Sequence, residues 1–464
     1  MSPAVSQYER YHIDVDPAPN VADHPSRFRV RVNRLQLASL LVTELFHFKG
    51  NLQIVMSRPC MYGVFSGPVG GFMPRPQNCV GCLRCTVQYP DIVRIEPNPA
   101  RMKLGDSYVT PEIVDTLLYE TSTGRLPVRG AGYRGPCGGP GWDGMWTDMS
   151  EIVRPTRDGI HGREFISTQV DLGEKPHFLV FDRGGRVSGE SPRVVSLPLP
   201  FLFDAPPLSA ESEPLWKGIV KAADTLQTLV VAPVRAALAY QLDSPSVVPM
   251  VRGSEVSSIA QLPCPPRIIE LEGWDEAAHA ALRSRYPEAL VCVRIPYPED
   301  IVALARRGLR YFHLVADYHG RASGSFVREA IRKAHDALVT AGLREQVTLV
   351  GSGGIVAAEH VPKAILCGLD AVALDISVVI ALQGRLVGEA VDRGTARVEM
   401  PSFDPAWAAQ RITNLCAAWR DQLLEILGAM GMREVRRLRG EVGRAMFQAD
   451  LEREAFAGIE GFEG

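Results

Sequence analysis

The stretch VTLVGSGGIVAAEHVPKAILCGLDAVALDIS, residues 347–377, holds the pattern that decides the fold. An apolar run, Val347–Val350, leads into glycines, a helix-like segment follows over 357–367, and a second apolar run, Ala371–Leu374, leads into Asp375. Both runs are continuous rather than alternating, which is typical of parallel strands covered on both faces. The stretch is therefore predicted to be one strand–helix–strand unit of an α/β domain.

The same pattern recurs along the chain from about residue 192. The expected strands are Val194–Phe203, Leu226–Ala232, Val247–Val251, Arg267–Leu271, Ala289–Ile295, Tyr311–Ala316, Val347–Val350 and Ala371–Leu374. Helix-like segments between them include 211–225, 274–285, 298–307, 325–341 and 357–367. Eight such units within about 200 residues favour a (β/α)8 TIM barrel, and an open doubly wound sheet is the alternative.

A second pattern decides the chemistry. Cys79, Cys82 and Cys85 form C-x2-C-x2-C with Pro90 after them, a spacing that lets three thiolates reach one iron–sulfur cluster from a single loop. The alternatives are a zinc loop, although no second C-x2-C pair exists, or three unrelated thiols. The fourth ligand of a 4Fe–4S cluster is expected to be Cys60, in a glycine-rich loop, rather than Cys137.

The sequence predicts five regions: an N-terminal extension (1–50), a ferredoxin-like iron–sulfur region (51–130), an ordered connector (131–191), the barrel (192–400) and a C-terminal helical cap (401–464). Within the first two regions, Leu35–Phe48 is predicted to be a helix and the segment from Asp91 a short strand.

Composition narrows the possible functions. The net charge of −3 gives no electrostatic case for binding nucleic acid or an anionic membrane. The first residues lack a signal-peptide pattern, and the apolar runs are too short to span a bilayer. Nine cysteines with a cluster motif indicate the reducing cytoplasm rather than a disulfide scaffold, with Cys264, Cys292, Cys367 and Cys416 as buried thiols.

Candidate site residues follow the barrel strands, because such barrels carry their sites at the C-terminal ends of the strands. Two segments are candidates to hold a phosphate: the glycine-rich turn Ser352, Gly353 and Gly354, and the helix-opening turn Asp375, Ile376 and Ser377. The alternatives are that the glycine-rich turn holds no ligand and that Asp375 only caps the helix that follows it. Candidate catalytic residues are Arg294, Asp317 and His319. A surface salt bridge would equally explain Arg294, and helix capping would equally explain Asp317 and His319.

The segments 147–171, 341–382 and 404–439 resemble glutamate synthase-related FMN proteins, notably the short archaeal-type forms with ferredoxin-like cysteines. The resemblance implies a barrel that binds FMN, with its phosphate at Gly353, Gly354 and the 375–377 turn. Arg294 takes the place of the family's flavin-facing lysine, and Asp317 aligns loosely with an Asp-Gly-Gly motif. The chain departs from the family after the first barrel strand, where Phe203-Asp-Ala-Pro-Pro-Leu-Ser replaces a flavin loop.

The sequence therefore supports two alternative functions. The first is an FMN- and iron–sulfur-dependent oxidoreductase that resembles the synthase part of glutamate synthase and passes electrons between the cluster and a barrel flavin. The second is a non-catalytic barrel subunit that has lost flavin and serves electron transfer or scaffolding in a larger redox complex. Both imply a redox partner protein, a ferredoxin or another subunit, and an oligomer or complex; the first also implies a small-molecule substrate.

Overall fold

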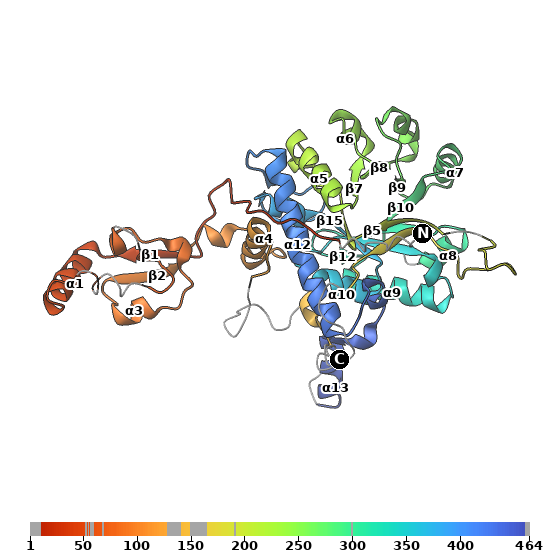
Figure 1. Cartoon of the computed structure of the whole chain (residues 1–464). Coiled ribbons are helices and arrows are strands. Elements are labelled where there is room, and N and C mark those ends of the chain that lie inside the picture. Colours follow the sequence, from red (N-terminus) through yellow and green to blue (C-terminus); the bar gives the residue numbers. More distant parts are fainter. Residues whose placement is uncertain are drawn as a thin grey trace, which may run out of the picture. The chain divides into compact units, whose positions relative to one another are not determined.

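The chain forms two compact units in the computed structural model, which describes residues 11–51, 53, 55, 60–66, 69–127, 141–148, 165–189, 192–297 and 300–459. The large unit comprises Met1–Val21 and Ser107–Gly464, and the small unit is Ala22–Asp106 (Figure 1). Most of the connector predicted over 131–191, and Cys137 with it, lies outside the described residues.

The large unit is built on a closed barrel of eight parallel strands. Around the barrel the order is β6 (Phe201–Phe203), β7 (Val230–Pro233), β8 (Val247–Val251), β9 (Ile268–Glu272), β10 (Leu290–Pro296), β11 (Tyr311–Val315), β14 (Thr348–Ser352) and β15 (Ala371–Leu374). Strand β15 pairs in parallel with β6, with Val372 opposite Phe201, and this pairing closes the barrel. The TIM barrel prediction is confirmed, and the open sheet is excluded.

The first expected strand, Val194–Phe203, is in fact two strands with different partners. Strand β5 (Arg193–Leu197) pairs antiparallel with β4 (Val170–Glu174) outside the barrel, and only β6 belongs to the barrel. Pro198 and Pro200 stand between β5 and β6. Proline has no N–H to donate to a ladder, so one strand cannot run through both positions.

Helices cover the outside of the barrel, as Figure 1 shows for several of them. They are α5 (Glu213–Leu226), α6 (Val234–Ala239), α7 (Glu276–Arg285), α8 (Ile301–Arg306), α9 (Val327–Thr340), α10 (His360–Cys367) and α11 (Ile376–Ala381), with a 3₁₀ helix, Gly253–Gln261, after β8. The expected strand from Leu226 begins only at Val230, because Leu226 is the last residue of α5.

The expected C-terminal cap is mainly the long helix α12 (Pro405–Ala429), which packs against α5 and against α4 (Pro111–Thr123). Its Arg411 is fully buried and donates to the carbonyls of Ala18 and Ala381 at 2.7 Å each. The tail is not wholly helical: β18 (Ala445–Phe447) pairs with β3 (Met145–Thr147) before α13 (Gln448–Phe456). Pairing to a distant segment imposed this strand on the tail.

The small unit begins and ends earlier than the expected iron–sulfur region, 51–130. Strand β1 (Phe28–Val32) pairs antiparallel with β2 (Val93–Pro97), so the residues before 51 fold together with the cysteine loop. The predicted helix and strand of this unit are present as α1 (Arg34–His47) and β2. At the other end, α4 packs on α11 and α12, which assigns the residues after Asp106 to the large unit.

In the described part of the chain, every helix is too short or too polar to cross a membrane. Three of the four thiols expected to be buried are buried, whereas Cys264 is partly exposed.

Candidate functional site

The cysteine loop of the small unit folds back on itself through two left-handed residues. Cys79 follows a 3₁₀ turn, Pro76–Asn78; Gly81 (φ 74°) and Leu83 (φ 59°) reverse the chain; and α3 (Arg84–Gln88) then carries Cys85. The backbone N–H of Gly81 donates to the Cys79 sulfur. Such a loop, in which the N–H of Gly81 is directed at a cysteine sulfur, suits an anionic cluster of sulfur ligands.

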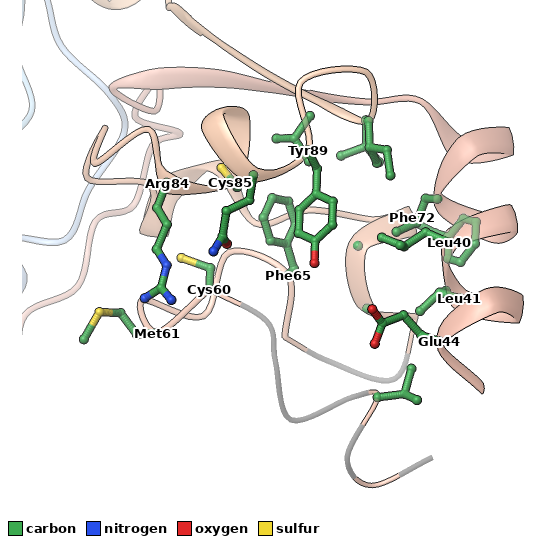
Figure 2. Close-up of a pocket in the computed structure, with 18 of the residues that line it drawn as sticks. Leu40, Leu41, Glu44, Cys60, Met61, Phe65, Phe72, Arg84, Cys85 and Tyr89 are labelled. Carbon is green, nitrogen blue, oxygen red and sulfur yellow. The ribbon is translucent and has the colours of Figure 1, made fainter. Parts of the chain in front are cut away.

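Cys60 joins the three cysteines of the motif. It lines the same cavity as Cys82 and Cys85, and its charge acts on Cys79. Figure 2 shows Cys60, Cys85 and Arg84 on one side of this cavity. The structure therefore brings together the four cysteines that the sequence proposed as ligands.

The cavity measures about 750 Å³, and its other walls are mostly apolar. Leu40, Leu41 and Phe72 lie across from the cysteines in Figure 2, with Phe65 and Tyr89 between them. An apolar wall lowers solvent access to a metal centre, which affects its redox potential.

Burial raises the pKa of the Cys79 and Cys85 thiols, and the neighbouring cysteines raise it further, while hydrogen bonds from Gly81 and Thr86 oppose the shift. A metal must therefore displace protons from these sulfurs to bind. Four thiolates fit an iron–sulfur cluster, and by donor type alone they also fit zinc.

In the large unit, four ionisable side chains meet inside the barrel, one from each of β9, β10, β11 and the residue after β6. Arg294 forms a two-pronged pair with Asp204, with Nη1–Oδ1 and Nη2–Oδ2 distances of 2.8 Å. Arg294 Nη1 also donates to Glu270 Oε1 at 2.9 Å. The other Glu270 oxygen lies 2.9 Å from Nδ1 of His313. We call these four residues the charge quartet.

Three members of the quartet are buried, since Asp204, Glu270 and His313 are each no more than 4% exposed, and the side chain of Arg294 is 13% exposed. Burial by itself raises the pKa of both carboxyls, but Arg294 and His313 outweigh it, so the pKa of Asp204 and that of Glu270 lie below their usual range. The positive charge of Arg294 is thus already neutralised by two carboxylates of the protein.

Beside the quartet, Asp375 caps α11 from the end of β15. Its Oδ1 accepts the N–H of Ile376 at 2.6 Å, and its carboxylate also accepts the N–H of Gly353. Burial, with a further contribution from the charge of Asp204, raises the pKa of Asp375 to about 7 against these two hydrogen bonds. Two N–H groups that the sequence assigned to a phosphate are therefore bonded to Asp375.

The glycine turn that ends β14 is packed against protein on its open side. A Cβ on Gly353 would lie 2.5 Å from the carbonyl oxygens of Ala316 and Asp317, and one on Gly354 would lie 2.6 Å from Cα of Gly320. The glycines are needed for this close backbone contact and for their positive φ, 94° and 73°. As the residues stand, an FMN phosphate does not fit between this turn and Asp375.

The remaining candidates lie elsewhere. Asp317 closes a turn, with Oδ1 accepting the N–H of Arg321 at 2.7 Å. His319 lies beside the ring of Tyr108, and its Nε2 is 3.7 Å from Glu389. Arg294 has contacts with neither of them among those the structure gives, so the three proposed catalytic residues do not form one constellation.

Sequence reasoning missed Asp204, Glu270 and His313. A signal was present, because Glu270 and His313 interrupt apolar runs that were recognised as strands, IIELE and YFHLV. A charged residue inside a buried strand requires a partner, and the register of the barrel supplies one.

Comparisons with known proteins agree with the resemblance seen in the sequence. Residues 319–433 match the conserved region in glutamate synthase. An archaeal-type glutamate synthase [NADPH] of Dehalococcoides mccartyi is 23% identical over 79% of this chain and 86% of that protein. An archaeal glutamate synthase [NADPH] of Archaeoglobus fulgidus is 24% identical over 78% of this chain and 84% of that protein. Among solved structures, a flavocytochrome b2 mutant aligns with 64% of this chain and 79% of its own at 13% identity and a TM-score of 0.39, too low to bear on function.

Proposed function

We propose that this chain, a divergent glutamate synthase-related protein, is an iron–sulfur redox protein of the reducing cytoplasm that exchanges electrons with a partner protein. The observation that carries the proposal is that Cys60, Cys82 and Cys85 line one cavity of the small unit and that Cys79 lies near enough to all three to interact with them electrostatically. A 4Fe–4S cluster held there supplies one-electron transfer.

The residues of this chain have distinct parts in holding the cluster. The four cysteines provide thiolate ligands, and the N–H of Gly81 donates to the sulfur of Cys79. Hydrogen bonds to sulfur and exclusion of water set the potential of such a centre. The apolar wall of the cavity keeps water away from one side, while Cys82 is exposed and marks the side from which electrons can pass.

The surroundings of Cys82 suit a protein partner. Met61, Leu83 and Val87 are exposed apolar side chains close to the cysteines in sequence, at 83%, 48% and 78% exposure. The small unit carries eleven Arg and Lys against five Asp and Glu, although the chain as a whole is acidic. An excess of basic residues together with exposed apolar side chains favours an acidic electron-transfer protein, such as a ferredoxin or an acidic subunit.

Metal analysis tests the proposal. Protein purified without oxygen is expected to contain about four iron atoms per chain. Cys79→Ser should lose this iron, and Cys264→Ser, a matched change at a cysteine away from the loop, should keep it. Cys60→Ser compared with Cys137→Ser identifies the fourth ligand. Zinc in place of iron, or no metal in the wild type, contradicts the proposal.

A second candidate is an FMN- and iron–sulfur-dependent oxidoreductase of the glutamate synthase type. It is favoured by one observation: Arg294 near the end of β10 and the Ser352–Gly354 turn after β14 share the end of the barrel where such folds carry their sites. A visible spectrum separates the candidates, because flavin bound to the purified protein would add its own bands to the broad absorbance of a cluster.

A further inference from the structure

The position that an FMN phosphate needs, at the ends of β14 and β15, is taken by the protein itself. A phosphate in such a barrel is held by backbone N–H groups of these two loops and of the helix that follows. Here the N–H groups of Gly353 and Ile376, one from each loop, both donate to the carboxylate of Asp375. We propose that Asp375 stands where the phosphate would bind and that the barrel therefore takes no FMN.

The charges agree with this assignment. Asp375 and Asp204 are close enough for each to disfavour a negative charge on the other, and Arg294 is already bonded to two carboxylates. Among the described residues, a phosphate dianion would find no uncommitted cation in this region, and a charge transferred from water to a buried site must be paired.

A segment of chain also joins two loops at this end of the barrel. The carbonyl of Val391 accepts the N–H of Tyr318, after β11, at 2.7 Å. The carbonyl of Arg393 accepts the N–H of Leu208, in the loop after β6, at 3.0 Å. Strands β14 and β15 lie between β11 and β6 in the barrel, so this segment connects the loops on either side of the expected phosphate position.

Some buried polar atoms around this end have no hydrogen-bond partner among the described residues: Nε2 of His313, the hydroxyl of Tyr318 and Oγ of Ser352 and of Ser377. These residues are at most 5% exposed. Ordered water bonds otherwise unsatisfied buried groups, so it is expected to be the partner of these atoms.

The inference deepens the proposed function, since it leaves the cluster as the redox group of the chain. The test uses the full-length protein with the substitutions Asp375→Asn and Asp375→Gly. A third variant, Asp375→Ser, is included in case the glycine variant does not fold, because serine can also cap a helix. FMN and inorganic phosphate are the probes. Flavin fluorescence quenching measures FMN binding, and the melting temperature in phosphate against chloride, at equal ionic strength, measures phosphate binding.

The wild type is expected to bind no FMN up to about a hundredfold excess and to melt at the same temperature in both salts. Asp375→Asn keeps the size of the side chain, so it should also give no phosphate effect. Asp375→Gly and Asp375→Ser free the N–H groups and should melt at a higher temperature in phosphate, since a ligand that binds only the folded state stabilises it.

Three results would overturn the inference: saturable FMN binding by the wild type, a phosphate effect in the asparagine variant equal to that in the glycine variant, or no effect in either smaller variant. Iron is measured in the same samples. Absence of iron from the wild type would refute the cluster but would say nothing about Asp375. FMN bound to the wild type would refute the proposed role of Asp375 but would say nothing about the cluster.

Discussion

Replacing Asp375 with asparagine should stabilise the large unit at neutral and alkaline pH and have much less effect in acid. The carboxyl is 2% exposed, its neighbour Asp204 is negative, and its pKa is raised from 3.8 to about 7. Arg294 and the two backbone N–H donors favour the charged form but do not outweigh burial. Asparagine retains an oxygen that can accept the N–H of Ile376 and carries no charge.

The sign and size follow from proton linkage. A carboxyl whose pKa is higher in the folded state contributes stability that is fully present below its unfolded pKa and is lost as pH rises through about 7. Between the usual pKa of 3.8 and the folded pKa of about 7, each pH unit is worth about 1.4 kcal/mol of stability. Ionisation of Asp375 therefore costs the wild type up to about 4 kcal/mol at pH 8. The stability of Asp375→Asn relative to the wild type should therefore rise by about 3 kcal/mol between pH 5 and pH 8.

Urea unfolding at several pH values, followed by tryptophan fluorescence, measures this difference, because all six tryptophans lie in the large unit. Asp300→Asn is the matched control: Asp300 caps α8, accepting the N–H of Ala303 at 2.9 Å, and it lies in an exposed environment. It reports the effect of the same substitution at an exposed helix cap, and the pH dependence of Asp375→Asn is measured relative to it. A difference for Asp375→Asn that stays constant within about 0.5 kcal/mol from pH 5 to pH 8 would refute the reasoning.

Further predictions concern the quartet, the glycine turn and the cluster. Arg294→Met leaves two carboxylates without their main partner and should cost about 3–5 kcal/mol in urea unfolding at pH 7, and a loss below about 1 kcal/mol would contradict the buried pairing. Gly353→Ala should lower the melting temperature far more than Gly308→Ala. Both glycines have φ 94°, but only a Cβ at position 353 would meet backbone atoms. Equal losses of melting temperature would mean that the backbone angle φ alone causes the destabilisation. Cys85→Ser should abolish the absorbance of the cluster while the melting of the large unit, followed by tryptophan fluorescence, stays unchanged; a joint loss would show that the cysteine site supports the barrel.

Much of the fold was determined by local sequence pattern. Continuous apolar runs such as Val247–Val251 and Ala371–Leu374 appear as strands with the bounds that the pattern predicted, because a strand covered on both faces needs apolar side chains throughout. The cysteine spacing likewise brought Cys79, Cys82 and Cys85 together, since ligands with two residues between them in a tight loop need no distant partner to converge.

What only the tertiary structure decided is which distant groups meet. Pairing of β1 with β2 drew residues 22–50 into the small unit, and Pro198 and Pro200 gave β5 a partner outside the barrel. Closure of the barrel set Asp204 against Arg294, 90 positions apart, and the ends of β14 and β15 gave Asp375 the two N–H groups that the sequence had reserved for a phosphate. A motif specifies which donors are present, but the partner of a buried donor is chosen by strand register and by the cost of leaving any buried charge unpaired.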